Sequence, residues 1–128
     1  MSKFVTQRVI SINAKELVEQ LVIDGIKQLD KFEKALKGTT YISEYRTILK
    51  YIEHAANGNS LPEKKFKLLK GVKDNIVEYE FKSKHIRVYA IQMPNNKIII
   101  FLGYKNTQAS DIISFRSLKK RYLESLNK

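Results

Sequence analysis

The stretch from Ile76 to Tyr104 constrains the fold of this chain more than any other. It holds three short runs rich in β-branched and aromatic residues, IVEYEFK, HIRVYAIQ and KIIIFLGY, with turn-forming residues between them. This spacing predicts three consecutive antiparallel strands, a β-meander. Ile98 to Leu102 in the last run are all apolar, which is typical of a strand covered on both faces. We therefore expect the last strand to lie in the middle of a sheet.

The first of these strands alternates apolar and polar residues, and the alternation suggests how it pairs with the second. Setting Phe81 opposite Ile86 keeps apolar side chains together on one face of the hairpin. The same register sets Glu80 opposite Arg87 on the other face. Opposite charges at such positions attract each other, so we expect Glu80 to hold Arg87 in place.

Strand and helix signals also flank the meander. Residues 4–12 are rich in β-branched side chains and predict an edge or next-to-edge strand. Asn13 is a candidate cap for a helix that runs to about Lys37 and ends at Gly38. Thr39 or Thr40 is a candidate cap for a second helix, which Asn57-Gly58 would end. Because the connection between them is short, the two helices should form an antiparallel hairpin over one face of the sheet.

We expect one α+β domain over residues 1–128, with the element order β-α-α-β-β-β-α and the helical hairpin packed on an antiparallel sheet. Its parts are the N-terminal strand and helical hairpin at 4–58, an extended connector at 59–75, the meander at 76–104 and a closing helix at 110–127.

Positive charge is concentrated in the second half of the chain. The whole sequence has 24 Lys and Arg against 13 Asp and Glu, a net charge of +11. Residues 61–128 carry 15 basic and 6 acidic side chains, whereas residues 1–60 carry 9 and 7. This asymmetry favours a polyanionic partner, most often a nucleic acid, with an acidic protein or simply solvated lysines as the alternatives. The candidate RNA-binding residues are Lys64, Lys65, Lys67, Lys70, Lys84, Lys119, Lys120 and Arg121.

Several kinds of site are excluded or disfavoured by the residues present. The chain has no cysteine, and none of its five glycines forms a phosphate-binding loop. His54 and His85 lack the spacing of metal ligands, so we expect no metal and no cofactor. No apolar run approaches the roughly 20 residues that cross a bilayer, and we expect a cytoplasmic protein without a membrane partner.

A polar patch is expected where the first hairpin meets the end of the third strand. Lysine and arginine can stabilise the charge that develops on a phosphodiester, and histidine or tyrosine can transfer a proton. An RNA 2′-hydroxyl is itself a nucleophile, so such a site needs no metal. A solvated hairpin tip explains the same residues as well. The patch comprises Lys82, Lys84, His85, Arg87, Tyr104 and Lys105.

Four short motifs follow one another in the second half: Lys67-Leu68-Leu69-Lys70-Gly71, Glu78-Tyr79-Glu80, Ile86-Arg87-Val88-Tyr89 and Tyr104-Lys105-Asn106-Thr107. In this order the segment, nearly all of residues 64–125, resembles the RelE/HigB superfamily of toxins from type II toxin–antitoxin systems. The resemblance is to its phage-derived HigB-like branch.

The resemblance implies a RelE-like fold and an endonuclease that cuts mRNA on the ribosome by metal-free attack of the 2′-hydroxyl. It also implies inhibition by a small antitoxin, here a HigA-like helix-turn-helix protein. By position, Arg87 would contact the scissile phosphate and Lys105 would help to bind it. Lys82, His85 and Tyr104 complete the candidate catalytic set.

Two residues depart from the family pattern. Glu80 replaces an arginine, and Asn106 replaces the second lysine of the family's lysine pair. Both changes predict weakened cleavage. One alternative is therefore a weakened relative that binds RNA, the ribosome or an antitoxin without cutting, and another is a ParE-like inhibitor of DNA gyrase. The nuclease interpretation as stated requires Arg87 to be accessible to an RNA backbone.

Overall fold

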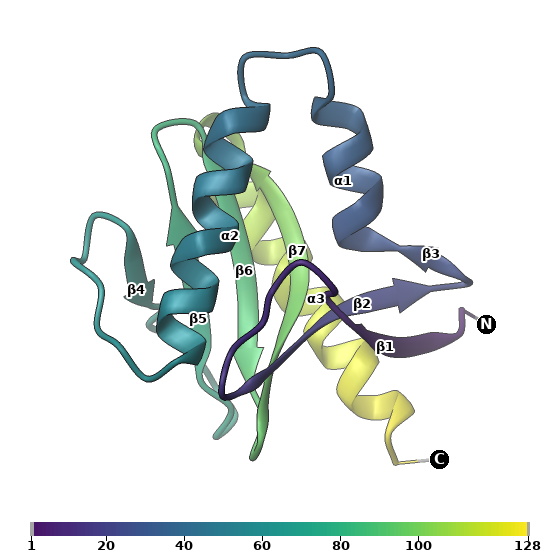
Figure 1. Ribbon diagram of the computed structural model, residues 1–128. Helices are drawn as coiled ribbons and strands as arrows, with labels where there is room; N and C mark the ends of the chain where they lie inside the picture. The colour runs from purple at the N-terminus through teal and green to yellow at the C-terminus, as the bar shows by residue number, and fades with distance from the viewer. Residues whose placement is uncertain (1, 128) are drawn as a thin grey trace.

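The computed structural model describes residues 2–127, which form a mixed β-sheet with helices on both faces (Figure 1). The elements in chain order are β1 (Phe4–Arg8), β2 (Leu17–Ile23), β3 (Ile26–Lys27), α1 (Gln28–Leu36), α2 (Ile42–Ala56), β4 (Phe66–Leu68), β5 (Glu78–Lys82), β6 (Ile86–Gln92), β7 (Asn96–Tyr104), the 3-10 turn η1 (Lys105–Thr107) and α3 (Gln108–Ser125).

The sheet is organised around β7. Its strand order is β1-β2-β7-β6-β5-β4, and the short β3 pairs with β2. The pairs are antiparallel except that β2 runs parallel to β7, so the expectation of a purely antiparallel sheet is wrong at this contact. β5, β6 and β7 form the predicted meander, and β7 is an inner strand as predicted. Ile99 packs into the core on one face of the sheet, while Ile98 and Ile100 pack into the core on the other.

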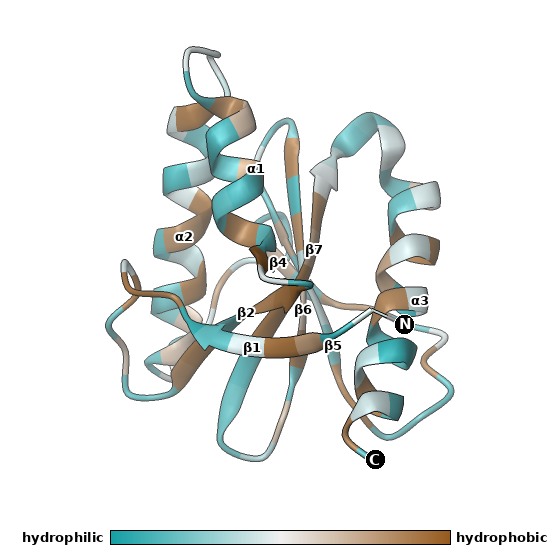
Figure 2. Ribbon diagram, turned by 90° about the vertical axis from the view of Figure 1, so that its right-hand side faces the viewer, coloured by the Kyte–Doolittle hydropathy of each residue, from teal (hydrophilic) through white to brown (hydrophobic). Residues whose placement is uncertain are grey.

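The helices divide between the two faces of the sheet. Figure 2 shows α1 and α2 on one face and α3 on the opposite face. Tyr45, Ile48 and Ile52 of α2 are fully buried in the first core, and Phe115 of α3 is fully buried in the second. The antiparallel helical hairpin predicted to cover one face is confirmed by α1 and α2 (Figure 1).

The first predicted helix is wrong over its first half. Residues 17–23 form β2, and helix α1 begins only at Gln28. The apolar residues of this segment fit helical spacing, but β2 lies inside the sheet and is covered on both faces, so a nearly continuous apolar run suits it as well. Asp24 and Gly25 have φ angles of 50° and 81° and form a tight turn between β2 and β3, in the middle of the segment predicted as one helix.

The ends of the sheet also differ from expectation. The first strand is an edge strand, as expected, but it ends at Arg8 rather than Ile12. The connector predicted to be merely extended contains β4, which pairs with β5 and forms the other edge. The last helix starts two residues earlier than predicted, at Gln108.

The predicted register of the first hairpin is shifted by two residues. Phe81 lies opposite Val88, Glu80 opposite Tyr89 and Lys82 opposite Arg87. A shift of two keeps every side chain on its face, so the apolar alternation could not reveal it. The turn decides the register, because Ser83 N–H donates to the Ile86 carbonyl at 3.1 Å and closes the hairpin there.

A buried charge network links α3 to the start of β5 and to the segment before it. Lys119 is only 2% exposed, and its Nζ lies 2.9 Å from both Asp74 Oδ1 and Glu78 Oε2. Arg116 contacts the other oxygen of Glu78 at 2.9 Å. Because a buried ammonium requires charged partners, this network fixes the position of α3 on the sheet.

Replacing Lys119 with alanine should lower the free energy of unfolding by about 3 kcal/mol, since Oε2 of the buried Glu78 carboxylate loses its cation and only the contact of Oε1 with Arg116 remains. Chemical denaturation of both proteins measures the difference. Lys120→Ala is the matched control, because Lys120 is exposed on the same helix and its loss should cost less than about 0.5 kcal/mol. Equal losses in the two variants would contradict a stabilising role for the network.

Candidate functional site

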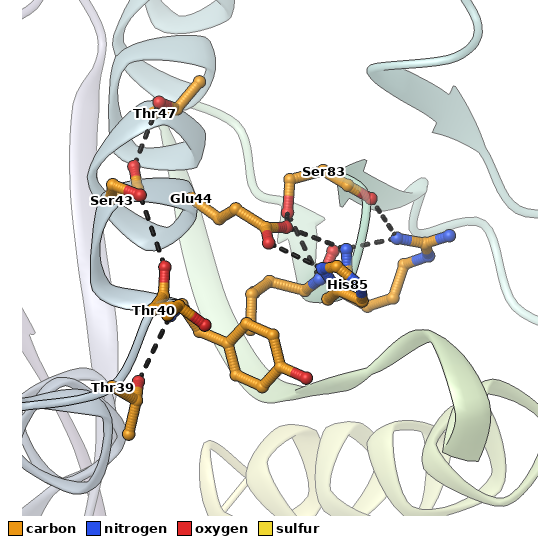
Figure 3. A network of polar contacts seen from close by, with 10 residues as sticks. Thr39, Thr40, Ser43, Glu44, Thr47, Ser83 and His85 are labelled. Atoms are coloured by element: carbon orange, nitrogen blue, oxygen red, sulfur yellow. Dashed lines mark hydrogen bonds and ion pairs between the residues drawn. The ribbon is translucent and has the colours of Figure 1, made fainter.

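One carboxylate organises the tip of the β5–β6 hairpin. Glu44, in the first turn of α2, accepts hydrogen bonds from Ser83 Oγ at 2.6 Å and from the His85 backbone N–H at 2.8 Å (Figure 3). Its other oxygen lies 2.7 Å from Nδ1 of the His85 ring. A single side chain of the helical layer thus fixes both the turn and the imidazole.

This contact determines how His85 can act. A carboxylate accepts hydrogen bonds, so the Nδ1 atom carries a proton and the neutral ring keeps Nε2 free as an acceptor. The His85 side chain is 42% exposed, which leaves the ring accessible to a ligand. An imidazole held by a carboxylate and open at Nε2 is the arrangement of a general base.

The hydrogen bonds also affect Glu44 itself. Partial burial alone would raise the pKa of this carboxyl, but the bonds from Ser83 and His85 outweigh it and lower the pKa below its usual value of 4.5. Glu44 therefore stays ionised through the neutral range and can stabilise a protonated His85 ring.

His85 lines a pocket of about 430 Å³ together with Tyr41, Tyr104, Lys105 and Asn106. The Tyr41 ring centre lies 5.0 Å from that of His85 and 6.0 Å from that of Tyr104. Lys105 N–H donates to the His85 carbonyl at 2.8 Å, which holds η1 against the hairpin. The pocket thus combines a proton acceptor, phenol groups and an exposed lysine.

Three of the five predicted catalytic residues, His85, Tyr104 and Lys105, come together in this pocket. Tyr41 and Glu44 were missed. Tyr41 fits the apolar spacing of its helix and so gives no signal of a site, and nothing in the sequence marks Glu44 as a partner of a residue on the distant hairpin.

Arg87 does not line this pocket. Its side chain is buried, with 7% exposed, and its Nη1 donates to the Ser83 carbonyl at 2.6 Å and the Ile86 carbonyl at 3.0 Å. It stabilises the hairpin turn from inside the molecule. The buried Arg87 is not accessible to an RNA backbone, so the expected contact with a scissile phosphate is wrong and the condition that the nuclease interpretation set on this residue is not met.

Glu80 is not paired with Arg87 as expected. None of the ion pairs within residues 2–127 joins the two side chains, and Glu80 Oε2 instead accepts a hydrogen bond from Gln108 Nε2 at 2.6 Å. Glu80 is fully buried opposite Tyr89. Burial and the nearby Glu80 charge raise the pKa of the Tyr89 hydroxyl. The register shift of two residues is what separates Glu80 from Arg87.

The remaining basic candidates fall into groups on different elements. Lys82 and Lys84 belong to the hairpin beside His85, where Lys84 is exposed and Lys82 partly buried. On α3, Lys119 is too deeply buried to contact RNA, which corrects its assignment, while Lys120 and Arg121 are exposed. Along the β4 edge, Lys64 and Lys70 are exposed, and Lys65 and Lys67 are partly buried.

Two other kinds of site are not found in the part of the chain that the structure describes. No three or more His, Asp or Glu side chains converge in a way that could hold a metal ion. No helix there has the length and apolar character needed to cross a membrane.

The lowered pKa of Glu44 predicts how stability depends on pH. A carboxyl with a folded-state pKa below its unfolded value stabilises the protein above pH 4.5, and that contribution is lost as the pH falls through the folded-state pKa. Glu44→Gln should therefore lose less stability than the wild type between about pH 5 and pH 3. Thermal unfolding across this range measures it, and parallel curves for the two proteins would contradict the assignment.

Comparison with known proteins assigns no family. No family model, no curated protein and no solved structure matches this chain.

Proposed function

We propose that this protein is an endoribonuclease of the RelE/HigB toxin kind, acting on mRNA at the ribosome, with His85 in place of Arg87 at the centre of its site. The observation that carries the proposal is the His85 ring. Its Nδ1 is fixed 2.7 Å from Glu44, and the ring lines a pocket beside Tyr104 and Lys105.

These residues supply the groups that metal-free RNA cleavage needs. Nε2 of His85 takes the proton of the ribose 2′-hydroxyl, and the 2′-oxygen forms a bond to the adjacent phosphorus. The bond from phosphorus to the 5′-oxygen breaks, leaving a 2′,3′-cyclic phosphate, and the leaving oxygen takes a proton. Glu44 stabilises the positive charge that His85 acquires. In this proposal the Lys105 ammonium neutralises the phosphate, and the Tyr104 hydroxyl donates the proton that the leaving oxygen takes.

The arrangement of elements also supports the proposal. The first strand β1, the helices α1 and α2, the meander β5, β6 and β7 and the closing helix α3 follow the expected order of elements. The strands β2, β3 and β4 are additions to that order. An RNA partner suits the net charge of +11. A HigA-like antitoxin and a cytoplasmic site of action remain part of the proposal through the resemblance alone.

His85→Ala should reduce cleavage of ribosome-bound mRNA by about 10²- to 10⁴-fold, because it removes the proton acceptor. Mapping RNA ends in a translation extract measures the effect. Lys105→Ala should reduce cleavage as well. His54→Ala is the control, since His54 is exposed in the last turn of α2 and lies outside the pocket. Full cleavage by the His85 variant would refute the proposed role of this ring.

A second candidate function is favoured by the burial of Arg87 and Glu80. A relative whose phosphate-binding arginine is covered can bind RNA or the ribosome without cutting it. In that case the wild type binds RNA tightly and produces no new RNA ends in the cleavage experiment.

Under either function, binding to single-stranded RNA should weaken steeply as salt is added, because phosphate contacts release counterions. Lys84→Ala should reduce the slope of log affinity against log salt concentration by about 1, the value for one lost phosphate contact. Lys119→Ala should leave this slope unchanged. Titrations at several salt concentrations measure both slopes. An affinity for RNA that does not change with salt would exclude phosphate contacts as its source.

A further inference from the structure

The second half of β7 has a strand neighbour on one side only. β2 pairs with β7 from Leu17–Asn96 to Gln20–Ile99, and the following residues of β2 pair with β1 and β3. β6 continues beside β7 as far as Tyr104. Within the described residues, the edge of β7 beyond Ile99 therefore has no strand along the side that faces away from β6.

The hydrogen-bond alternation identifies which backbone groups lie on this open edge. In an antiparallel pair, every second residue turns its N–H and C=O towards the partner strand. Lys105 N–H donates to the His85 carbonyl, so Lys105 and Gly103 face β6, while Leu102 and Tyr104 face away. Tyr104 N–H donates to Asp111 at 3.3 Å, and its carbonyl accepts from Thr107 Oγ1 at 3.2 Å. Leu102 keeps its N–H and C=O without a strand partner.

A groove of about 230 Å³ runs along this edge. Its β7 wall consists of Ile100, Phe101 and Leu102, and its α1 wall consists of Gln28, Lys31, Phe32 and Ala35. The α1 residues are spaced by three, four and seven positions and so share one face of the helix. Figure 2 shows α1 and α3 on opposite sides of β7. A groove with a strand edge on one wall and a helix on the other accepts an extended peptide.

The charges at the groove favour an acidic occupant. Lys31 lines it, whereas the two acidic residues of α1 are engaged elsewhere. Asp30 accepts a hydrogen bond from Gln20 at 3.3 Å, and Glu33 lies beside Tyr45. Acidic side chains of a peptide bound in this groove would therefore lie near the Lys31 ammonium and away from the carboxylates of α1.

We propose that an acidic, extended segment of a partner protein binds here by adding a strand to β7 beside Leu102. The main-chain bonds to Leu102 would set its direction, the apolar groove would take alternate side chains, and Lys31 would select for negative charge. The proposal does not depend on the catalytic role of His85.

The test uses short acetylated peptides of alternating valine with glutamate, or of valine with lysine as the matched control. In the free protein, the Leu102 amide should exchange with solvent faster than those of Phe101 and Gly103, which NMR hydrogen exchange measures. The glutamate peptide at millimolar concentration should protect the Leu102 amide, and the lysine peptide should not.

Lys31→Glu should weaken binding of the glutamate peptide about tenfold at low salt, because it reverses the charge at the groove. Lys34→Glu is the control, since Lys34 is exposed on the same helix but does not line the groove. Failure of the glutamate peptide to protect Leu102, or equal affinities in these two variants, overturns the proposal. Protection that grows with protein concentration alone also overturns it, because the occupant is then a second copy of this chain.

Discussion

Three hydrogen bonds to the Glu44 carboxylate connect the two layers from which the candidate site is made. The helix contributes the acceptor, and the hairpin contributes the Ser83 hydroxyl and the backbone and ring of His85. Without this contact the hairpin tip would be an exposed turn of three polar residues, and the imidazole could adopt many orientations. With it, the position of the proton-accepting nitrogen is set by the packing of α2 on the sheet. The chemistry proposed for His85 therefore rests on the same helix that forms one core of the fold.

The opposite face of the sheet uses polar groups differently. Between α3 and the strands, Glu78, Glu80, Arg87 and Lys119 are all buried, which is unusual for charged side chains in a chain of this size. Glu78 and Lys119 pair with each other, but Glu80 Oε1 and Arg87 Nε have no hydrogen-bond partner among the described residues. This interface holds α3 in a defined position, and it keeps Arg87 away from the surface where RNA would lie. The face with α2 carries the accessible chemistry, and the face with α3 carries the internal charges.

Much of the sheet could be predicted from the sequence because its meander is local. Turn residues separate three runs of β-forming residues, and the uniformly apolar run of β7 indicates an inner strand. The region around β2 was misassigned because Leu17, Val18, Leu21 and Val22 satisfy a helical period as well as a doubly covered strand. The strand is favoured over the helix by pairing with the parallel neighbour β7, which lies far away in the sequence. Tertiary packing here overrides the local pattern.

The candidate site shows the same limit. His85, Tyr104 and Lys105 could be singled out because they lie at or next to the ends of strands in a basic half of the chain. The burial of Arg87 could not be predicted, because it depends on the register of the hairpin. The expected and the observed register differ by two residues, and both leave each side chain on the same face. Nor could Glu44, since its contact with the hairpin joins residues that are about forty positions apart. The local sequence pattern therefore identified three residues of the candidate site. The contact that orients the His85 ring comes from the packing of α2 on the hairpin, which the local pattern does not contain.

The parallel contact between β2 and β7 bears on the order in which the chain assembles. β5, β6 and β7 can pair as soon as each is available, because only tight turns separate them. β2 pairs with a strand that follows α1, α2 and the β5–β6 hairpin in the sequence. Bringing β2 and β7 together closes a long loop and therefore costs more conformational entropy. On a ribosome, β2 is therefore synthesised long before its partner, and the full length of the β7 edge is briefly uncovered when it emerges. The short overlap of the two strands, which ends at Ile99, means that completion of folding covers only the first part of that edge.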